Sequence, residues 1–477
     1  MSAPAPLTPL EVIEVPAGRW HDRVAAALAA GGRFLGLYAE HHSVPAQVTL
    51  ALGSDTHTTI LRTRPIVGEI PSIVDLLPAA EWDEREAHDL FGVTFAGHTP
   101  LRPLVAHPAA TADWTTPIIG EDVHQVAVGP IHAGIIESGH FRFHVVGERI
   151  LHLDLRLFYK HRGLEQAAIG GAPEAALALA QRACAACAVT NTVAVAHAYE
   201  TALGGTPDRA LRRARTLLLE LERLYNHLND IGAVCAGIGF APGAMAFAAL
   251  KERAQRINAQ LTGHRFLFGS VRLGASTMSV ESRAANELRA AIAEIGADAA
   301  AMWREIRMNG SVRDRLIGTG VLAPDEAARL GTCGPAGRAS GATHDARAHS
   351  PLLWYPEFTP TRLNDPVGDV AARLEIRAGE LVTCCAILAE LLRTPITPGR
   401  IDARGHATNL GIGVVESPRG QTVAALEHHG GVVRRLHLRT GSFANWPSLA
   451  LATTDAILPD FPLINKSFEL CYACADR

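Results

Sequence analysis

Two Cys-x-x-Cys pairs are the residues of this chain best suited to chemistry. Cys184 and Cys187 lie in QRACAACAV, and Cys471 and Cys474 lie in SFELCYACADR at the C-terminal end of the 477-residue sequence. Four thiolates can hold one soft or borderline metal, because polarizable sulfur prefers such metals to hard cations. Zinc ribbons place their pairs about 15–20 residues apart, so pairs this distant do not predict a local zinc knuckle. They predict a site that closes late, which suits a cofactor inserted before the fold is sealed.

The other four cysteines are less promising as chemical groups. Cys235, Cys384 and Cys385 lie in apolar, helix-like segments, where a free thiol behaves as a small hydrophobic side chain. Cys333 lies in a glycine-rich loop and stays ambiguous. The N-terminus MSAPAPLTPLEVIEV has neither a basic region nor an apolar core of a signal peptide, so a disulfide framework is not expected.

Composition points to a globular enzyme of several domains. Hydrophobic residues make up 48% of the chain and charged residues 19%, and a chain this long exceeds the size of a single core. The formal net charge of -4 gives no electrostatic reason to bind nucleic acid or an anionic membrane. Apolar runs such as LVTCCAILAELL are shorter than the roughly 20 residues that span a bilayer. We therefore expect a soluble protein that docks, if at all, on a membrane partner.

The pattern of hydrophobic residues predicts an α+β fold in two parts. Residues 1–105 mix strand-like and short helical runs and are expected to form a small α+β domain, followed by a linker rich in Pro, Thr and Ala over residues 106–122. Residues 123–477 are expected to form a large domain. Its core is predicted to be a bundle of long helices, because residues 172–306 are rich in Ala, Leu, Arg and Glu at helical spacing. Peripheral β-structure is predicted on either side of that helical region, where apolar residues alternate.

Several motifs in a fixed order carry a resemblance to a known family. These motifs are VGPIHAGIIESGHFRF, LDLRLFYKHRGLEQ, GPAGRASGATHDAR, VESPRGQTV and SFANWPSL. Together with the two cysteine pairs, they resemble the large subunit of group 4 nickel-iron hydrogenases of the formate hydrogenlyase and hydrogenase-4 type, homologous to the 49 kDa subunit of respiratory complex I. The first domain, with EWDEREAHDLFGVTF, resembles the 30 kDa subunit of complex I. The resemblance covers about residues 50–477.

The resemblance implies a nickel-iron hydrogenase, an oxidoreductase that interconverts dihydrogen with protons and electrons. It implies that four cysteines bind nickel, with Cys187 and Cys474 also bridging to iron and with Cys184 and Cys471 terminal. The iron of the family carries carbonyl and cyanide ligands made by maturation proteins. A maturation protease of the family cuts after the position of Arg477, so the resemblance implies either a processed form or a gene that stops at the mature end.

Three residues are implied to act beside the metals. Cys471 is expected to accept the first proton, and Glu137, in IIESGHF, to carry it onward. Arg419, in ESPRG, matches an arginine that lies over the metals and polarises the vacant position. His132 matches a quinone-contacting position of the complex I relatives. Taken alone, Glu137 and His132 would more often be structural residues.

The sequence departs from the family pattern around both cysteine pairs. Ala185 replaces a glycine, and Asn191 replaces a histidine four residues after Cys187. Glu469-Leu470 replaces the usual Asp-Pro before the last pair. These changes keep every implied ligand and alter the residues that orient them. Glu469 is expected to remain available as a carboxylate partner for Arg419.

Two other functions stay open. One is a complex I-like quinone-reductase or assembly subunit without a nickel-iron centre, and the other is a scaffold with a structural zinc on the four cysteines.

Two charged segments are interpreted as structural. LRRARTLLLELERL is predicted to be an amphipathic helix with a solvated face, and EWDEREAHDLF is predicted to form an interdomain or subunit contact.

The implied partners follow from what the chain lacks. No further cysteine cluster suits an iron-sulfur centre, so the resemblance implies a small subunit with a [4Fe-4S] cluster, ferredoxin-like subunits and membrane subunits related to antiporters. The expected location is cytoplasmic, at the inner face of the membrane through those partners. The electron donor, the direction of turnover and any coupling to ion pumping are not predicted.

Overall fold

The structure is a computed structural model. It describes residues 10–40, 46–54, 57–66, 68–108, 110–111, 114–132, 137–355, 358–403 and 405–477. The start of the N-terminal stretch in which no signal peptide was expected, and part of the segment around Glu137, lie outside the described residues.

A four-stranded sheet forms the centre of the N-terminal part. Its order is β1 (Leu10–Glu14), β4 (Thr58–Thr63), β3 (Gln47–Gly53) and β2 (Arg33–Glu40), and β1 and β4 run parallel. Side chains alternate between the two faces of a strand. Leu50 and Leu52 pack with residues of α1 (Trp20–Ala29) and α2 (Glu81–Phe91), whereas Ala51 packs on the other face. A short parallel pair, β5 (Glu69–Pro71) and β6 (Thr94–Ala96), completes this part.

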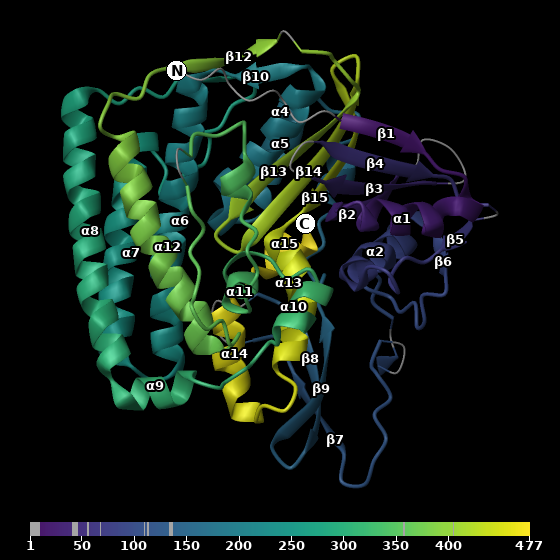
Figure 1. Cartoon of the computed structure of the whole chain (residues 1–477). Coiled ribbons are helices and arrows are strands. Elements are labelled where there is room, and N and C mark those ends of the chain that lie inside the picture. Colours follow the sequence, from purple (N-terminus) through teal and green to yellow (C-terminus); the bar gives the residue numbers. More distant parts are fainter. Residues whose placement is uncertain are drawn as a thin grey trace.

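A bundle of long helices forms the core of the large part (Figure 1). The helices are α6 (Arg209–Gly237), α7 (Ala241–Thr262), α8 (Ser282–Met308) and α12 (Val370–Leu391), and α6 contacts both α7 and α12. Asp208 caps α6, because its carboxylate accepts a 2.7 Å hydrogen bond from the backbone N–H of Leu211.

The prediction of a solvated face on α6 is wrong. Arg215, Glu220 and Arg223 are 2%, 0% and 0% exposed. Arg215 pairs with Glu200 at 2.5 Å, and Arg223 lies 3.5 Å from Glu380. These side chains face opposite charges instead of water, whereas residues 212 and 213 are partly exposed and donate to backbone carbonyls.

A second layer lies between the bundle and the N-terminal sheet. The antiparallel strands β13 (Leu410–Ser417), β14 (Gly420–His429) and β15 (Val432–Arg439) pack against α5 (Ala188–Ala202), which follows α4 (Pro173–Ala183). Gly413 permits this contact, since a Cβ atom there would overlap the backbone of Ala194. On the other face, Leu410 and Val423 pack with Ala51 of β3. The N-terminal sheet is therefore covered on both faces.

The remaining elements surround these layers. A three-stranded antiparallel sheet, β7 (His124–Val128), β8 (His140–Val146) and β9 (Arg149–Arg156), projects at the lower end of Figure 1. The others are α3 (Leu164–Ala168), β10 (Gly205–Pro207), β11 (Ala275–Ser276), α9 (Gly310–Leu316), α10 (Pro324–Arg329), α11 (Gly334–Ala339), β12 (Gly399–Ala403), α13 (Gly441–Ala452), α14 (Phe461–Phe468) and α15 (Tyr472–Asp476).

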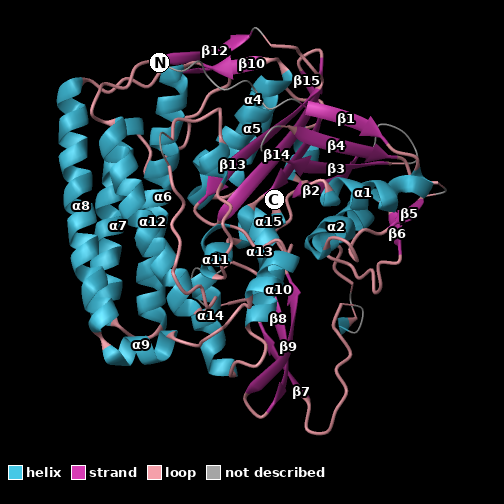
Figure 2. Ribbon diagram, viewed as in Figure 1, coloured by secondary structure: helices cyan, strands magenta, loops and turns pink. Residues whose placement is uncertain are grey.

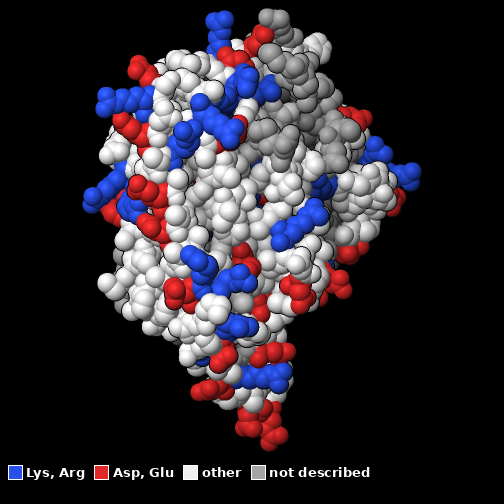
Figure 3. Space-filling model, turned by 60° about the vertical axis from the view of Figure 1, so that its left-hand side comes forward, with Lys and Arg blue, Asp and Glu red and all other residues white. Residues whose placement is uncertain are grey.

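The α+β fold with a long-helix core and peripheral strands is confirmed (Figure 2). The division at residues 105 and 122 stays a prediction. On the face shown in Figure 3, positive and negative side chains are interspersed, in keeping with the small net charge. Within the described ranges, every helix is too short or too polar to cross a lipid bilayer.

Candidate metal centre

The first cysteine pair lies at the junction of two helices. α4 ends at Ala183, and Cys184 is extended, with φ −157° and ψ 133°. Ala185–Cys187 form one 3-10 turn, in which the Cys187 N–H donates to the Cys184 carbonyl at 3.4 Å, and α5 then begins. The break between the helices places both thiols on the same turn.

The second pair is positioned by another break between helices. α14 ends at Phe468, and its C-cap residue Glu469 adopts the left-handed conformation at φ 51° and redirects the chain. Cys471 then caps α15, because its sulfur accepts a 3.4 Å hydrogen bond from the N–H of Cys474. The hydroxyl of Ser442 on α13 accepts from the Cys471 N–H at 3.0 Å and fixes the start of this turn.

The two pairs converge on one buried cluster. The Sγ atoms of Cys471 and Cys184 lie 3.0 Å apart, and those of Cys184, Cys187 and Cys474 all lie within 4.8 Å of one another. Cys474 is 0% exposed, and none of the four is disulfide-bonded. The predicted closure of the site by the end of the chain is therefore confirmed.

The thiol cluster requires a cation to become fully ionised. Hydrogen bonds from the other three cysteines lower the pKa of Cys184 well below its ordinary value. Interaction with that thiolate raises the pKa values of Cys187, Cys471 and Cys474. Without a metal the cluster holds one thiolate readily and resists further ionisation, whereas a bound metal would compensate all four charges. This donor set fits a soft metal centre.

Arg419 lies beside the cluster in the two-residue turn between β13 and β14. Its Nε donates to the carbonyl of Glu469 at 2.9 Å, its Nη1 donates to the side-chain oxygen of Asn226, and its Nη2 lies 3.1 Å from the Asp230 carboxylate. Burial disfavours the charge, but Asp230 and Cys187 raise the pKa of Arg419 above its ordinary value. The guanidinium is therefore fixed and charged next to the thiols.

The expected pairing between Arg419 and the Glu469 carboxylate does not occur. Arg419 uses the backbone oxygen of Glu469, while the Glu469 side chain accepts from Asn229 at 3.2 Å. The left-handed conformation of Glu469 turns its carbonyl toward Arg419, and Asp230 supplies the carboxylate. Asn226 and Asp230 are spaced four residues apart on α6, a signal of one shared face that the sequence analysis did not use.

Glu137 is held by the second cysteine turn. Its carboxylate accepts a 2.8 Å hydrogen bond from the N–H of Ala473, between the two cysteines of that pair. Its charge contributes to raising the pKa of Cys471. His132 is bound elsewhere, since its Nε2 donates to the carbonyl of Gly139 at 2.8 Å. The structure thus brings Glu137, but not the His132 ring nitrogens, into contact with the cysteine turns.

Glu222 is a site residue that the sequence analysis missed. Its carboxylate accepts from the backbone N–H groups of Val189 at 2.6 Å and Thr190 at 3.1 Å, and so caps α5 directly after Cys187. Burial raises the pKa of Glu222 to about 7 despite those hydrogen bonds. Asn226 supports the same turn through a 2.8 Å bond to the Ala186 carbonyl. Only the packing of α6 against this turn reveals both roles.

Two of the residues that differ from the family pattern, Ala185 and Asn191, have different surroundings. Ala185 is exposed in the 3-10 turn, and its carbonyl lies 3.4 Å from the Tyr225 hydroxyl. Asn191 is fully buried on α5, and among the described residues its side-chain amide has no hydrogen-bond partner.

A chain of buried charges extends behind Arg419. Asp230 also pairs with Arg377 at 3.3 Å, and its other neighbour His227 hydrogen-bonds Glu380 through Nε2 at 2.9 Å. Glu380 in turn pairs with Arg338 at 2.5 Å. Removing one member of such a set leaves an uncompensated charge without water, which costs several kcal/mol.

Glu469 should make the stability of the metal-free protein depend on pH. Burial and Asp230 raise the pKa of Glu469 from 4.5 to about 7. The folded protein then holds this proton more tightly than the unfolded chain. The resulting stabilisation of the folded state is fully present below pH 4.5 and is lost as pH rises through about 7. In Glu469→Gln, the fall in unfolding free energy between pH 5 and pH 8 should be smaller by up to about 3 kcal/mol. Urea denaturation at both pH values measures this change.

The control for that experiment is Glu287→Gln, which alters a 66% exposed side chain on α8. The unfolding free energy of this variant should change between pH 5 and pH 8 as much as that of the unaltered protein. Equal pH dependence in Glu469→Gln as well would contradict the assignment of a buried, protonated Glu469.

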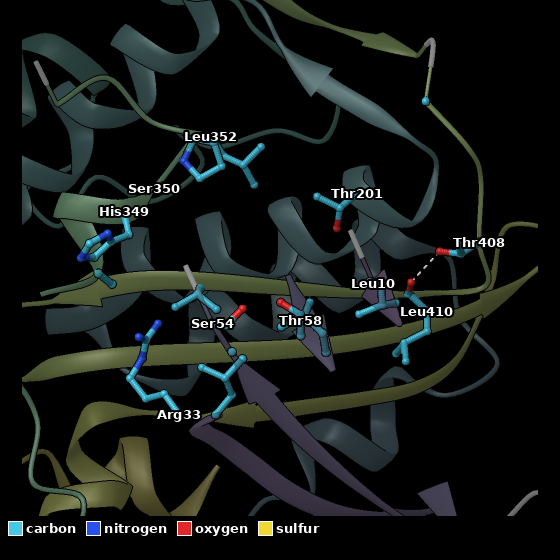
Figure 4. Close-up of a pocket in the computed structure, with 18 of the residues that line it drawn as sticks. Leu10, Arg33, Ser54, Thr58, Thr201, His349, Ser350, Leu352, Thr408 and Leu410 are labelled. Carbon is cyan, nitrogen blue, oxygen red and sulfur yellow. Dashed lines mark hydrogen bonds between the residues drawn. The ribbon is translucent and has the colours of Figure 1, made fainter. Parts of the chain in front are cut away.

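A separate cavity of about 440 Å³ lies between the N-terminal sheet and β13 (Figure 4). Arg33 and Thr58 line it from one side, and Thr201 and His349 line it from the other. The four clustered cysteines are not among its lining residues.

Comparison with family models identifies both parts of the chain. Residues 19–118 match the respiratory-chain NADH dehydrogenase 30 Kd subunit, and residues 237–410 match the 49 Kd subunit. A solved chain of the membrane-bound sulfane sulfur reductase, an archaeal respiratory membrane complex, shares the fold. It has a TM-score of 0.69 and 24% identity, over 76% of this chain and 100% of that chain.

Individual relatives cover most of the sequence. Formate hydrogenlyase subunit 5 of Escherichia coli is 30% identical over 86% of this chain and 77% of its own length. Hydrogenase-4 component G of the same organism is 30% identical over 86% of this chain and 76% of its own length. The carbon monoxide-induced hydrogenase of Rhodospirillum rubrum is 25% identical over 74% of this chain and 99% of its own length. The chain therefore belongs to the formate hydrogenlyase and hydrogenase-4 family of large subunits, with complex I 30 kDa-like and 49 kDa-like parts in one polypeptide.

Proposed function

We propose that this chain is the catalytic large subunit of a membrane-associated nickel-iron hydrogenase complex that interconverts dihydrogen with protons and electrons. The observation that carries the proposal is the convergence of four cysteine sulfurs from both ends of the large part on one buried point. Arg419 and Glu137 approach the same cysteine turns. The names of the hydrogenase relatives support this function.

Cys184, Cys187, Cys471 and Cys474 would hold a nickel-iron centre. When bound, this centre would supply the heterolytic cleavage of dihydrogen, which releases a proton to the protein. The protein's own contribution begins with a thiolate, Cys471, that can take up the proton. Because Cys471 is the partly exposed member of the cluster and lies near Glu137, it is placed to pass the proton on.

Arg419 acts by position and charge. Three hydrogen bonds, to Glu469, Asn226 and Asp230, hold its planar guanidinium. A fixed cation beside the thiolates stabilises negative charge that develops there and needs no rearrangement during the reaction.

The alternative functions explain less of the geometry. A metal-free, quinone-binding subunit gives no reason for four clustered thiols. A structural zinc uses the thiols but gives no reason for a buried arginine and a glutamate beside them. Electrons would leave through a small subunit with a [4Fe-4S] cluster, then ferredoxin-like subunits, and antiporter-like membrane subunits would hold the complex at the inner face of the membrane.

Metal analysis of the purified complex tests the proposal. We expect nickel and iron together in the large subunit and infrared bands from iron-bound carbonyl and cyanide. Zinc alone, with no such bands, would overturn the nickel-iron assignment and support the structural site.

Arg419→Lys should lower hydrogen turnover at least about tenfold, because lysine is a mobile point charge without the planar fork that three acceptors now hold. Nickel content, measured by mass spectrometry, should stay unchanged. Arg149→Lys is the control, since that arginine is 63% exposed in a surface ion pair. Unchanged turnover in Arg419→Lys would remove this residue from the mechanism.

A further inference from the structure

The residue that follows the last cysteine by three positions is buried in a pocket of acids. Arg477 is 2% exposed. Its Nη2 lies 2.7 and 2.8 Å from the two carboxylate oxygens of Glu86, and its Nη1 lies 3.0 Å from Glu165. Its guanidinium also stacks 4.7 Å from the centre of the Phe443 ring. A single guanidinium nitrogen thus donates to both oxygens of one desolvated carboxylate, and hydrogen bonds between charged groups are stronger than neutral ones.

The large part also holds the backbone of this tail. Asp476 accepts from the N–H groups of Phe158 at 2.7 Å and Lys160 at 2.9 Å, and the Arg477 carbonyl accepts from the Arg162 N–H at 2.8 Å. The Thr440 hydroxyl donates to the Cys474 carbonyl at 3.0 Å. These hydrogen bonds hold the segment that carries the second cysteine pair against the rest of the large part.

Glu86 differs from the other partners because it belongs to the N-terminal part. It lies on α2, the helix of the EWDEREAHDLF segment, whose Asp83 pairs with Arg439 at 2.9 Å. This segment was predicted to form an interdomain or subunit contact, and it contacts the large part of the same chain. One face of α2 meets two arginines of the large part, and one of these arginines is in the closing tail.

We propose that Glu86 is a positioning residue for the metal centre. By holding Arg477 from the N-terminal part, it keeps Cys471 and Cys474 closed over Cys184 and Cys187. Docking of the N-terminal part and closure of the tail then share one ion pair, so each stabilises the other to the same extent. That the closed cysteines hold a metal rests on the function proposed above. The closure itself is a property of the metal-free chain.

The test measures closure directly in the metal-free, full-length chain. Alkylation of Cys471 and Cys474 by iodoacetamide, resolved by peptide mass spectrometry, should be at least about tenfold faster in Glu86→Gln. Arg477 then keeps Glu165 but loses its contact with both oxygens of the Glu86 carboxylate, which favours local opening. Glu86→Asp, which keeps the charge on a shorter side chain, should restore part of the protection. Glu81→Gln is the matched control, since Glu81 lies on the same helix with a 38% exposed side chain.

Internal controls separate local opening from unfolding. Cys384 on α12 is 0% exposed and should stay unreactive in every variant that keeps its bundle. The double variant Glu86→Gln/Arg477→Gln should react no faster than Arg477→Gln alone, because the two changes remove one interaction. In the reciprocal direction, Arg477→Gln should speed amide hydrogen exchange in α2 while leaving α6 unchanged.

Unchanged alkylation in Glu86→Gln, additive effects in the double variant, or unchanged exchange of α2 in Arg477→Gln would each overturn the proposal. These readouts involve no metal. A failure of the nickel-iron assignment therefore leaves the test of Glu86 intact, and a failure of closure leaves the metal analysis intact.

Discussion

Replacing Cys187 or Cys474 with serine is expected to abolish hydrogenase activity and to remove most of the nickel. Both sulfurs lie in the buried cluster, at 3% and 0% exposure. A serine hydroxyl is a hard donor that stays protonated and cannot replace a soft thiolate ligand. Changing residues that merely orient ligands already costs about 10–100-fold in affinity or activity, so the loss of a ligand should exceed that range. Metal analysis and a hydrogen-evolution assay measure both effects.

Cys235→Ser is the matched control for these variants. Cys235 is equally buried, at 1% exposure, but lies near the end of α6 outside the cluster. Its replacement can cost stability but should leave the nickel content per folded chain unchanged. If Cys187→Ser or Cys474→Ser kept both nickel and activity, the four-cysteine centre would be wrong.

Glu137→Gln is expected to lower hydrogen turnover by about a hundredfold or more, the typical contribution of a positioned acid or base. Glutamine can still accept the hydrogen bond from Ala473, which now measures 2.8 Å, so the cysteine turn should stay in place. What is lost is a group that can carry a proton. Nickel content should therefore remain while turnover falls, and Glu137→Asp should retain part of the activity.

The control for Glu137 is Glu148→Gln, which changes an exposed glutamate in the turn between β8 and β9. Its turnover should equal that of the unaltered complex. A Glu137→Gln variant with normal turnover would show that the proton leaves the cluster by another group, such as Glu222, whose buried carboxylate caps α5 directly after Cys187.

Helices and strands could be predicted well where their pattern of apolar residues is set by neighbours in the sequence. Alternating apolar residues predicted β-structure on either side of the helical region, where β8, β9 and β13 to β15 lie, because a strand with one buried face repeats every two residues. Helical spacing over residues 172–306 predicted the region that contains α6, α7 and α8. The order of the motifs predicted the family, and the cysteine spacing predicted that the C-terminal segment closes a buried site.

The partners of buried charges could not be predicted. Helical periodicity separates a polar face from an apolar one, but it does not tell whether the polar face meets water or opposite charges. Arg223 on α6 was therefore assigned to a solvated face, although Glu380 of α12 lies 3.5 Å away. The carboxylate partner of Arg419 was misassigned for the same reason, since Asp230 is remote in sequence and adjacent only in the fold.

The sequence by itself determined which groups are present: four cysteines in two pairs, an arginine in a tight turn, a glutamate before a strand, and the local preferences of most helices and strands. Tertiary structure alone decided how these groups are held. Glu222 caps α5, Asp230 and the Glu469 carbonyl fix Arg419, and Glu86 holds Arg477. Each of these contacts joins segments far apart in the chain. Their free energy depends on burial and on exact distances between charges, and neither quantity exists until the layers have packed together.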